Sequence, residues 1–74
     1  MSWDHRVLRH EDGTLAVYEV FYDDDGHLVN RTETPVPADG DDLADVLATI
    51  EQMRAACALP ILDFATVCAG KAGG

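Results

Sequence analysis

The chain has 74 residues, of which 47% are hydrophobic and 26% are charged, the composition of one small globular domain. Its fourteen acidic and five basic residues give a formal net charge of −9. That balance argues against direct binding to nucleic acid, because phosphates are bound by clustered Lys and Arg. No apolar run approaches the roughly 18–20 residues that span a bilayer, and the N-terminus has no secretory signal pattern, so we expect a cytoplasmic protein without a membrane partner.

Three strands are predicted in the first half of the chain, over residues 3–10, 15–22 and 27–32. The middle segment, LAVYEVFY, is dense in the β-branched and aromatic residues that favour strands. Asp12-Gly13 and Asp25-Gly26 separate the three segments, and an Asp-Gly pair is typical of a two-residue hairpin turn. The pattern therefore predicts an antiparallel β-meander.

One helix is predicted in the second half, from about Asp42 to Ala58, where Pro60 stops it. The preceding Thr34-Pro35-Val36-Pro37 must be extended, because each proline disfavours helix in the residue before it. The apolar residues of the helix recur at helical spacing and form one stripe, which consists of Leu43, Val46, Leu47, Ile50, Met53 and Cys57.

These elements predict an α+β fold over residues 1–64, in which three antiparallel strands are followed by a helix packed across one face of the sheet. Residues 65–74 are predicted to be a flexible tail. A chain of this length buries only about 60% of the surface that its unfolded form exposes. A partner or a second copy could therefore complete its core.

Two-residue turns would also fix the register, with Arg9 opposite Ala16 and Val20 opposite Arg31. The helix would then cover the face that carries Trp3, Val7, Ala16, Tyr18, Val20, Tyr22 and Val29. The other face would be a candidate interaction face, formed by Leu8, Leu15, Val17 and Phe21 together with a cross-strand ion pair of Arg6 and Glu19. Residues 61–64, a second copy or a foreign partner could cover it, and a slip of one residue would exchange the two faces.

The acidic segment FYDDDGHL resembles part of a calcium loop but lacks its essential ligands. If Gly26 takes the sixth position of an EF-hand loop, Phe21 falls on the first position and Thr32 on the twelfth, which normally carry carboxylates. We therefore expect a hairpin turn and no metal site. Cys57 and Cys68 lack zinc-ligand spacing, and Cys57 is expected to be a buried thiol on the helix stripe.

No catalytic constellation is recognisable in the sequence. It contains no Gly-rich phosphate loop and no Gly-x-Ser-x-Gly nucleophile motif. His5 and His10 should point to opposite faces of one strand, and no nucleophile has an evident base beside it. We therefore expect a protein that is not an enzyme and that uses no cofactor.

Four segments in this order resemble a group of short, uncharacterised bacterial proteins. They are WDHRV (residues 3–7), EVFYDDDG (19–26), TETPV (32–36) and LPILD (59–63). The pattern of the group runs W-x-x-R-V, E-V-Y-Y-D-x-x-G, T-E-x-P-V, an amphipathic helix and a proline-containing close. Phe21 stands where the group usually has Tyr, and the tail after Asp63 is particular to this chain. The resemblance supports the predicted fold and implies no site.

The expected function is that of a small acidic interaction module, an accessory or regulatory subunit that docks on a larger, possibly basic, protein or forms a homodimer through the Leu8-Val17-Phe21 face. The alternative is an acidic mimic of nucleic acid that inhibits a basic phosphate-binding protein. Such a mimic would use acidic side chains expected at neighbouring ends of the fold, namely Asp23, Asp24, Asp25, Asp39, Asp41 and Asp42.

Overall fold

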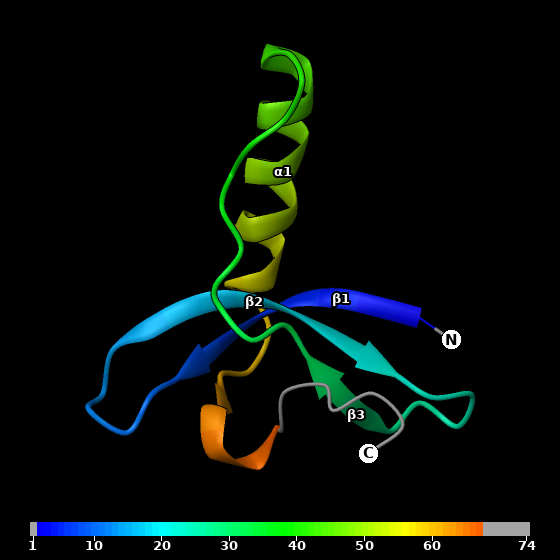
Figure 1. The fold of residues 1–74 in the computed structure, drawn as a ribbon, viewed down its shortest axis with the longest axis vertical. Helices are drawn as coiled ribbons and strands as arrows, with labels where there is room; N and C mark the ends of the chain where they lie inside the picture. The colour runs from blue at the N-terminus through cyan, green and yellow to red at the C-terminus, as the bar shows by residue number, and fades with distance from the viewer. Residues whose placement is uncertain (1, 68–74) are drawn as a thin grey trace.

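The computed structural model describes residues 2–67 and has an α+β fold (Figure 1). In chain order, the elements are β1 (Ser2–Arg9), β2 (Leu15–Tyr22), β3 (Leu28–Arg31), α1 (Leu43–Ala56), β4 (Leu62–Asp63) and the short 3-10 helix η1 (Phe64–Thr66). The strands form one curled sheet in the order β3-β2-β1-β4. β1, β2 and β3 are antiparallel as predicted, whereas β4, which was not predicted, pairs with β1 in parallel.

The hairpin loop between β1 and β2 has three residues, 11–13, between the hydrogen-bonded His10 and Thr14, and not the predicted two. The Gly13 N–H donates to the His10 carbonyl at 2.9 Å, and the His10 N–H donates to the Thr14 carbonyl at 2.8 Å. Gly13 has a φ of 92°, the left-handed conformation that glycine adopts without steric cost. A tight turn followed by a left-handed glycine is the usual form of a three-residue hairpin loop.

The loop between β2 and β3 repeats this geometry. The Gly26 N–H donates to the Asp23 carbonyl at 3.0 Å, and the Asp23 N–H donates to the His27 carbonyl at 2.9 Å. Gly26 has a φ of 83°. The acidic segment therefore forms a hairpin turn, as the sequence analysis predicted, with one residue more in the loop.

The additional loop residue shifts the register of β1 against β2 by one position. Arg9 pairs with Leu15 and not with Ala16. Arg6 pairs with Tyr18, so the predicted Arg6–Glu19 ion pair is wrong. Side chains alternate between the two faces of a strand. The shift therefore places each β1 side chain on the opposite face of the sheet from the one predicted, relative to the side chains of β2.

A β-bulge in β3 restores part of the predicted pairing. Tyr22 pairs with Leu28 and Phe21 pairs with Asn30, so Val29 has no counterpart on β2. Val20 therefore pairs with Arg31, as predicted, although the turn is longer. The bulge has a second effect, because it places Leu28 and Arg31, three positions apart, on the same face of the sheet.

That face carries the core of the protein. Leu8 and Val20 are completely buried, and Tyr18 and Val67 are only 2% and 5% exposed. Leu62 and Phe64 pack against this cluster. We call residues 60–67 the C-terminal arm; in it, β4 pairs with β1 at the edge of the sheet and η1 lies below the strands in Figure 1. The arm, and not the helix, therefore covers the core face. Residues 65–67, predicted to belong to the tail, are part of the fold, whereas Cys68 and the rest of that segment lie outside the described residues.

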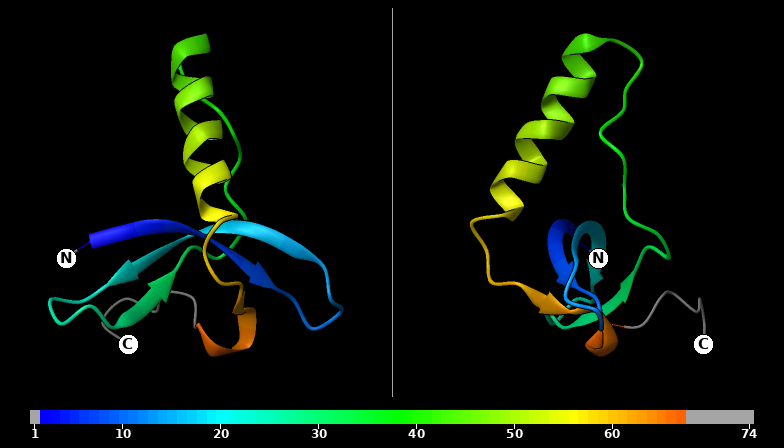
Figure 2. Two further views of the ribbon diagram at one scale, coloured as in Figure 1. Left: turned by 180° about the vertical axis from the view of Figure 1, so that it is seen from behind. Right: turned by 90° about the vertical axis from the view of Figure 1, so that its left-hand side faces the viewer.

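The helix projects away from the sheet instead of lying across it (Figure 2). Asp42 caps its N-terminus, because the Asp42 carboxylate accepts a hydrogen bond from the Asp45 N–H at 2.9 Å. Ala56, at the other end, is the residue of α1 that is fully buried. Residues 32–42 run back along the helix to reach its N-terminus (Figure 2). The predicted packing across the sheet is therefore wrong: α1 contacts β1 near one end of the helix, and the C-terminal arm covers the core face. Among the described residues, no helix has the length and apolar character that crossing a membrane requires.

Candidate functional site

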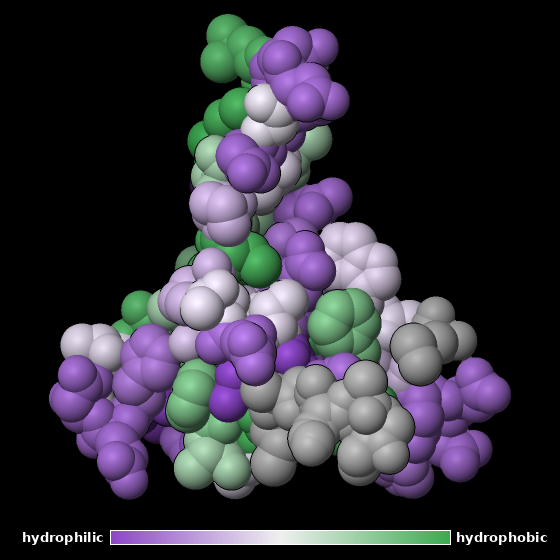
Figure 3. All heavy atoms as spheres, in the orientation of Figure 1, coloured by the Kyte–Doolittle hydropathy of each residue, from purple (hydrophilic) through white to green (hydrophobic). Residues whose placement is uncertain are grey.

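The outer flank of α1 carries a row of exposed apolar side chains. Leu43 is 81% exposed, Leu47 55% and Ile50 45%. Their spacing of four and three residues places them on one side of the helix. We call these three residues the α1 stripe. Figure 3 shows apolar side chains gathered along one flank of the projecting helix.

The two sides of the predicted apolar row have different environments. Val46 and Met53 are half-buried, whereas the three residues of the α1 stripe are exposed. Cys57, predicted to be buried with the row, is exposed. The prediction therefore found the apolar periodicity, but only part of the row is covered by the protein itself.

Charged residues mark both ends of the α1 stripe. Arg54 is exposed and lies four residues after Ile50, so it continues the stripe by one helical turn. Asp41 and Asp42 precede Leu43 at the N-terminal end, where acidic groups interact favourably with the helix dipole. The stripe is thus an apolar row with a negative end and a positive end.

The structure does not bring the predicted interaction face together. Leu8 is completely buried in the core, and its strand neighbour Arg6 turns toward the same side. Arg6 donates to the Pro60 carbonyl at 2.7 Å and to the Tyr22 hydroxyl at 3.4 Å, which holds the C-terminal arm. The remaining members lie on the opposite face of β2, where Leu15 is exposed and three residues are half-buried, namely Val17, Glu19 and Phe21.

The predicted acidic patch is also divided. The hairpin that holds Asp23, Asp24 and Asp25 is at one corner of the sheet, whereas residues 39–42 are at the tip of the projecting helix (Figure 1). The two groups of acids therefore lie at separate extremities of the molecule and not at neighbouring ends.

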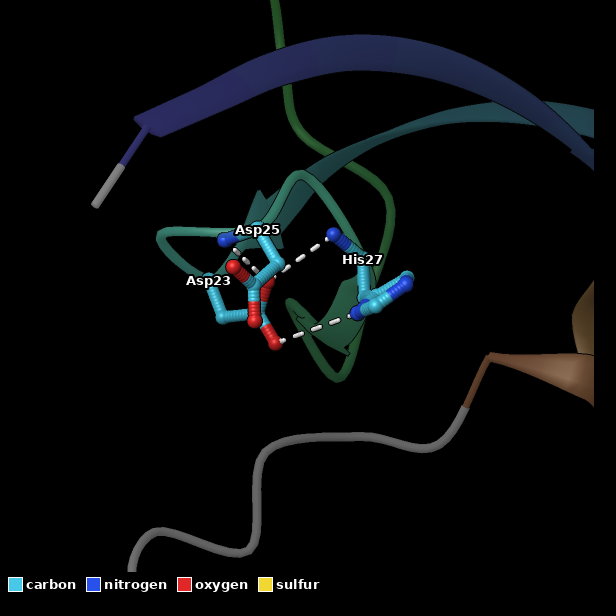
Figure 4. Close-up of side chains that lie close together, drawn as sticks. All are labelled: Asp23, Asp25 and His27. Atoms are coloured by element: carbon cyan, nitrogen blue, oxygen red, sulfur yellow. Dashed lines mark hydrogen bonds and ion pairs between the residues drawn. The ribbon is translucent and has the colours of Figure 1, made fainter.

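The acidic turn nevertheless gathers three groups capable of binding a metal ion. One ligand atom from each of Asp23, Asp25 and His27 lies within 4.8 Å of the others (Figure 4). One oxygen of Asp23 accepts hydrogen bonds from the Asp25 and His27 N–H groups, both at 2.9 Å. The His27 N–H, as the strongest of these contacts, holds the pKa of the Asp23 carboxyl below its ordinary value. The turn geometry by itself accounts for this gathering, and the expected lack of a metal site stays a prediction.

An aromatic and cationic cluster between the sheet and the C-terminal arm was missed by the sequence analysis. The ring of His10 lies 5.1 Å from that of Phe64, and its two nitrogens contact the Thr14 hydroxyl at 2.9 Å and the Tyr18 hydroxyl at 2.7 Å. Arg31 stacks on Phe64 from β3. The strands bring His10 and Arg31 to Tyr18, and the arm adds Phe64 to them.

An open hollow of about 630 Å³ adjoins this cluster, and its lining includes Arg9, His10, Asp63 and Phe64. The Arg9 guanidinium is 3.5 Å from an Asp63 oxygen, and both His10 nitrogens are engaged as described above. These polar groups are thus directed at one another. Arg9, His10 and Asp63 thus make their contacts within the protein, and Glu11 at the edge of the hollow does not by itself form the convergent set of polar groups that orients a small ligand.

Comparison of the chain with models of protein families, with curated proteins and with solved structures gives no match. The resemblance to short bacterial proteins thus stays a prediction, and the site must be interpreted from its geometry.

Proposed function

We propose that this protein is a small acidic interaction module, an accessory or regulatory subunit that binds another protein chain through the α1 stripe. The exposure of Leu43, Leu47 and Ile50 on a projecting helix carries this proposal. The proposed docking surface is thus the helix and not the sheet face expected from the sequence, because Leu8 of that sheet face is buried in the core.

Physical reasons support the helix as the docking element. Complete burial of one Leu or Ile side chain contributes about 1.5–3 kcal/mol. Isolated helices shorter than about 12–15 residues are marginal in water, and most helices in proteins are stabilised by packing of an apolar face. α1 has 14 residues and buries Ala56 at its end, so a partner on its exposed flank would stabilise the helix as well as the complex.

The acidic mimic has less support than the interaction module. A mimic of nucleic acid must present its charges as a continuous array, whereas the turn at residues 23–25 and the loop at residues 39–42 lie at separate extremities (Figure 1). Exposed acidic side chains then act chiefly to keep the protein soluble.

Photo-crosslinking in the host cell tests the proposal. A photo-reactive amino acid is placed at Leu47, and a matched control carries it at Val29, which is 52% exposed on β3 compared with 55% for Leu47. The Leu47 position should give one discrete protein adduct that the Val29 position does not give. Mass spectrometry then identifies the adduct.

A second variant makes the test specific for the stripe. Adding Leu43→Asp and Ile50→Asp to the Leu47 probe should remove the adduct, while circular dichroism of the purified variant should still show the native fold. The same set of adducts at positions 47 and 29, or no adduct at position 47, would contradict the proposed docking through α1.

A further inference from the structure

We infer that the chain that covers the α1 stripe is a second copy of this protein, packed with its helix antiparallel to the first. This inference names the partner of the site described above and therefore rests on the proposed function. It follows from the order of charged and apolar side chains along the helix.

The stripe is complementary to itself under a two-fold axis. Along one helix, the order is acidic at Asp41, Asp42 and Asp45, apolar at the stripe, and basic at Arg54, with Glu51 between Ile50 and Arg54. An antiparallel copy presents the same groups in reverse order. With the axis between Leu47 and Ile50, each of these two residues contacts the other in the second copy, and Arg54 lies beside the acidic end of that copy. A surface that pairs with itself in this way is what a symmetric dimer requires.

A parallel arrangement would lack this complementarity. It would place the two acidic ends side by side and leave both Arg54 side chains next to one another, and like charges in contact are destabilising. It would also align the two helix dipoles in the same direction, whereas antiparallel helices bring the positive end of one dipole to the negative end of the other. The charges at the two ends of the α1 stripe therefore favour the antiparallel arrangement.

The net charge of the chain gives the dimer an unusual dependence on salt. Each copy carries a formal charge of −9, so the two copies repel one another at long range. Salt screens this repulsion, while burial of the apolar stripe is not weakened by screening. Dimerisation should therefore strengthen as sodium chloride is added, whereas docking of this acidic chain on a basic protein would weaken.

Sedimentation equilibrium on the purified full chain measures the association. We expect the mass to rise from 8.0 kDa toward twice that value between micromolar and submillimolar concentration, and the dissociation constant to fall with added salt. Leu47→Asp should weaken the dimer by at least about tenfold, because it buries an unpaired charge. The matched control is Leu15→Asp, because Leu15 is 51% exposed on β2 and should leave the association unchanged.

Charge exchange and a distance measurement test the antiparallel arrangement. Arg54→Glu should weaken the dimer severalfold, and adding Asp41→Lys should recover most of that loss. Asp41 is chosen because Asp42 caps the helix. Spin labels on Cys57, with Cys68 replaced by Ser, should be separated by about 25 Å, since Cys57 lies about eight residues beyond the axis and a helix rises 1.5 Å per residue.

The outcomes are distinguishable from those of the proposed function. A chain that stays monomeric throughout, while Leu47 cross-links to a different protein, would overturn the dimer and leave the interaction module intact. A dimer that Leu47→Asp does not affect would overturn dimerisation through the α1 stripe, and the cross-linking at Leu47 would still decide whether the stripe binds a different protein. A short Cys57–Cys57 distance, or no recovery by Asp41→Lys, would overturn the antiparallel arrangement.

Discussion

The guanidinium carbon of Arg31 lies 3.8 Å from the centroid of the Phe64 ring. Arg31 is only 8% exposed, and it donates hydrogen bonds to the carbonyls of Val67 and Thr32. Within the described part of the chain, no carboxylate forms an ion pair with it. A buried cation is thus held by an aromatic ring and by backbone oxygens, and these contacts fasten the C-terminal arm to β3.

Replacement of Arg31 should destabilise the fold through these contacts. Arg31→Met keeps much of the side-chain volume but leaves the Val67 and Thr32 carbonyls without their donor, and we expect a loss of about 2–4 kcal/mol in the free energy of unfolding. The control is Arg9→Met, which removes an exposed ion pair with Asp63 and should lose less than about 1 kcal/mol. Urea denaturation measures the free energy of unfolding of both variants. Equal losses for Arg31→Met and Arg9→Met would show that the Arg31 contacts do not hold the arm.

A pair of leucine substitutions tests which surface is the core. Leu8 is completely buried and Leu47 is 55% exposed. Leu8→Ala should therefore lose about 2–5 kcal/mol, while Leu47→Ala should change the stability by less than about 0.5 kcal/mol in dilute, monomeric protein. Thermal and urea denaturation at low concentration give both values. A large loss for Leu47→Ala would indicate that α1 packs across the sheet after all, as the sequence pattern predicted.

The sequence could predict where the elements lie but not how β1 pairs with β2. The segment LAVYEVFY and the acidic cap of the helix are local signals, and β2 and α1 begin and end within about two residues of their predicted positions. Asp-Gly, in contrast, is compatible with loops of two or three residues, because both place a glycine at positive φ. That one residue of loop length decides the face of every side chain on β1.

The sequence could likewise predict the apolar stripe of α1 but not whether the rest of the protein covers it. The 3.6-residue periodicity of α1 is correctly predicted, but periodicity states only that a stripe exists and not what covers it. The core face is taken by Phe64 and Val67, two apolar residues that follow a proline and carry no periodic signal of their own. Their contact with Arg31 depends on the bulge at Val29, which no local pattern in the sequence indicates.

The hairpin loops should be sensitive to any side chain at their glycines. Gly13→Ala and Gly26→Ala should each lose about 1–2 kcal/mol, because both residues have positive φ, which disfavours a Cβ atom. A Cβ at either position would have no atom within 4 Å, so the loss is conformational and not a clash. Gly→Asn, which tolerates positive φ better, should lose less at both positions. Equal losses for Ala and Asn in urea denaturation would contradict a left-handed conformation.

The same two loops should make the stability depend on pH in the acidic range. A hydrogen bond from the Thr14 hydroxyl lowers the pKa of the Asp12 carboxyl, and the His27 N–H does so for Asp23. A carboxyl with a lowered pKa in the folded state stabilises the fold above its ordinary value of 3.8, and this contribution is lost as the pH falls through the lower folded value. In the double variant Asp12→Asn and Asp23→Asn, the urea midpoint should therefore decrease less as the pH falls below 3.8. The control, Glu33→Gln with Asp39→Asn, removes the same amount of charge outside both loops. In this control, the urea midpoint should decrease with falling pH as steeply as in the original chain. An equally weak pH dependence in the control would assign the effect to net charge and not to the turns.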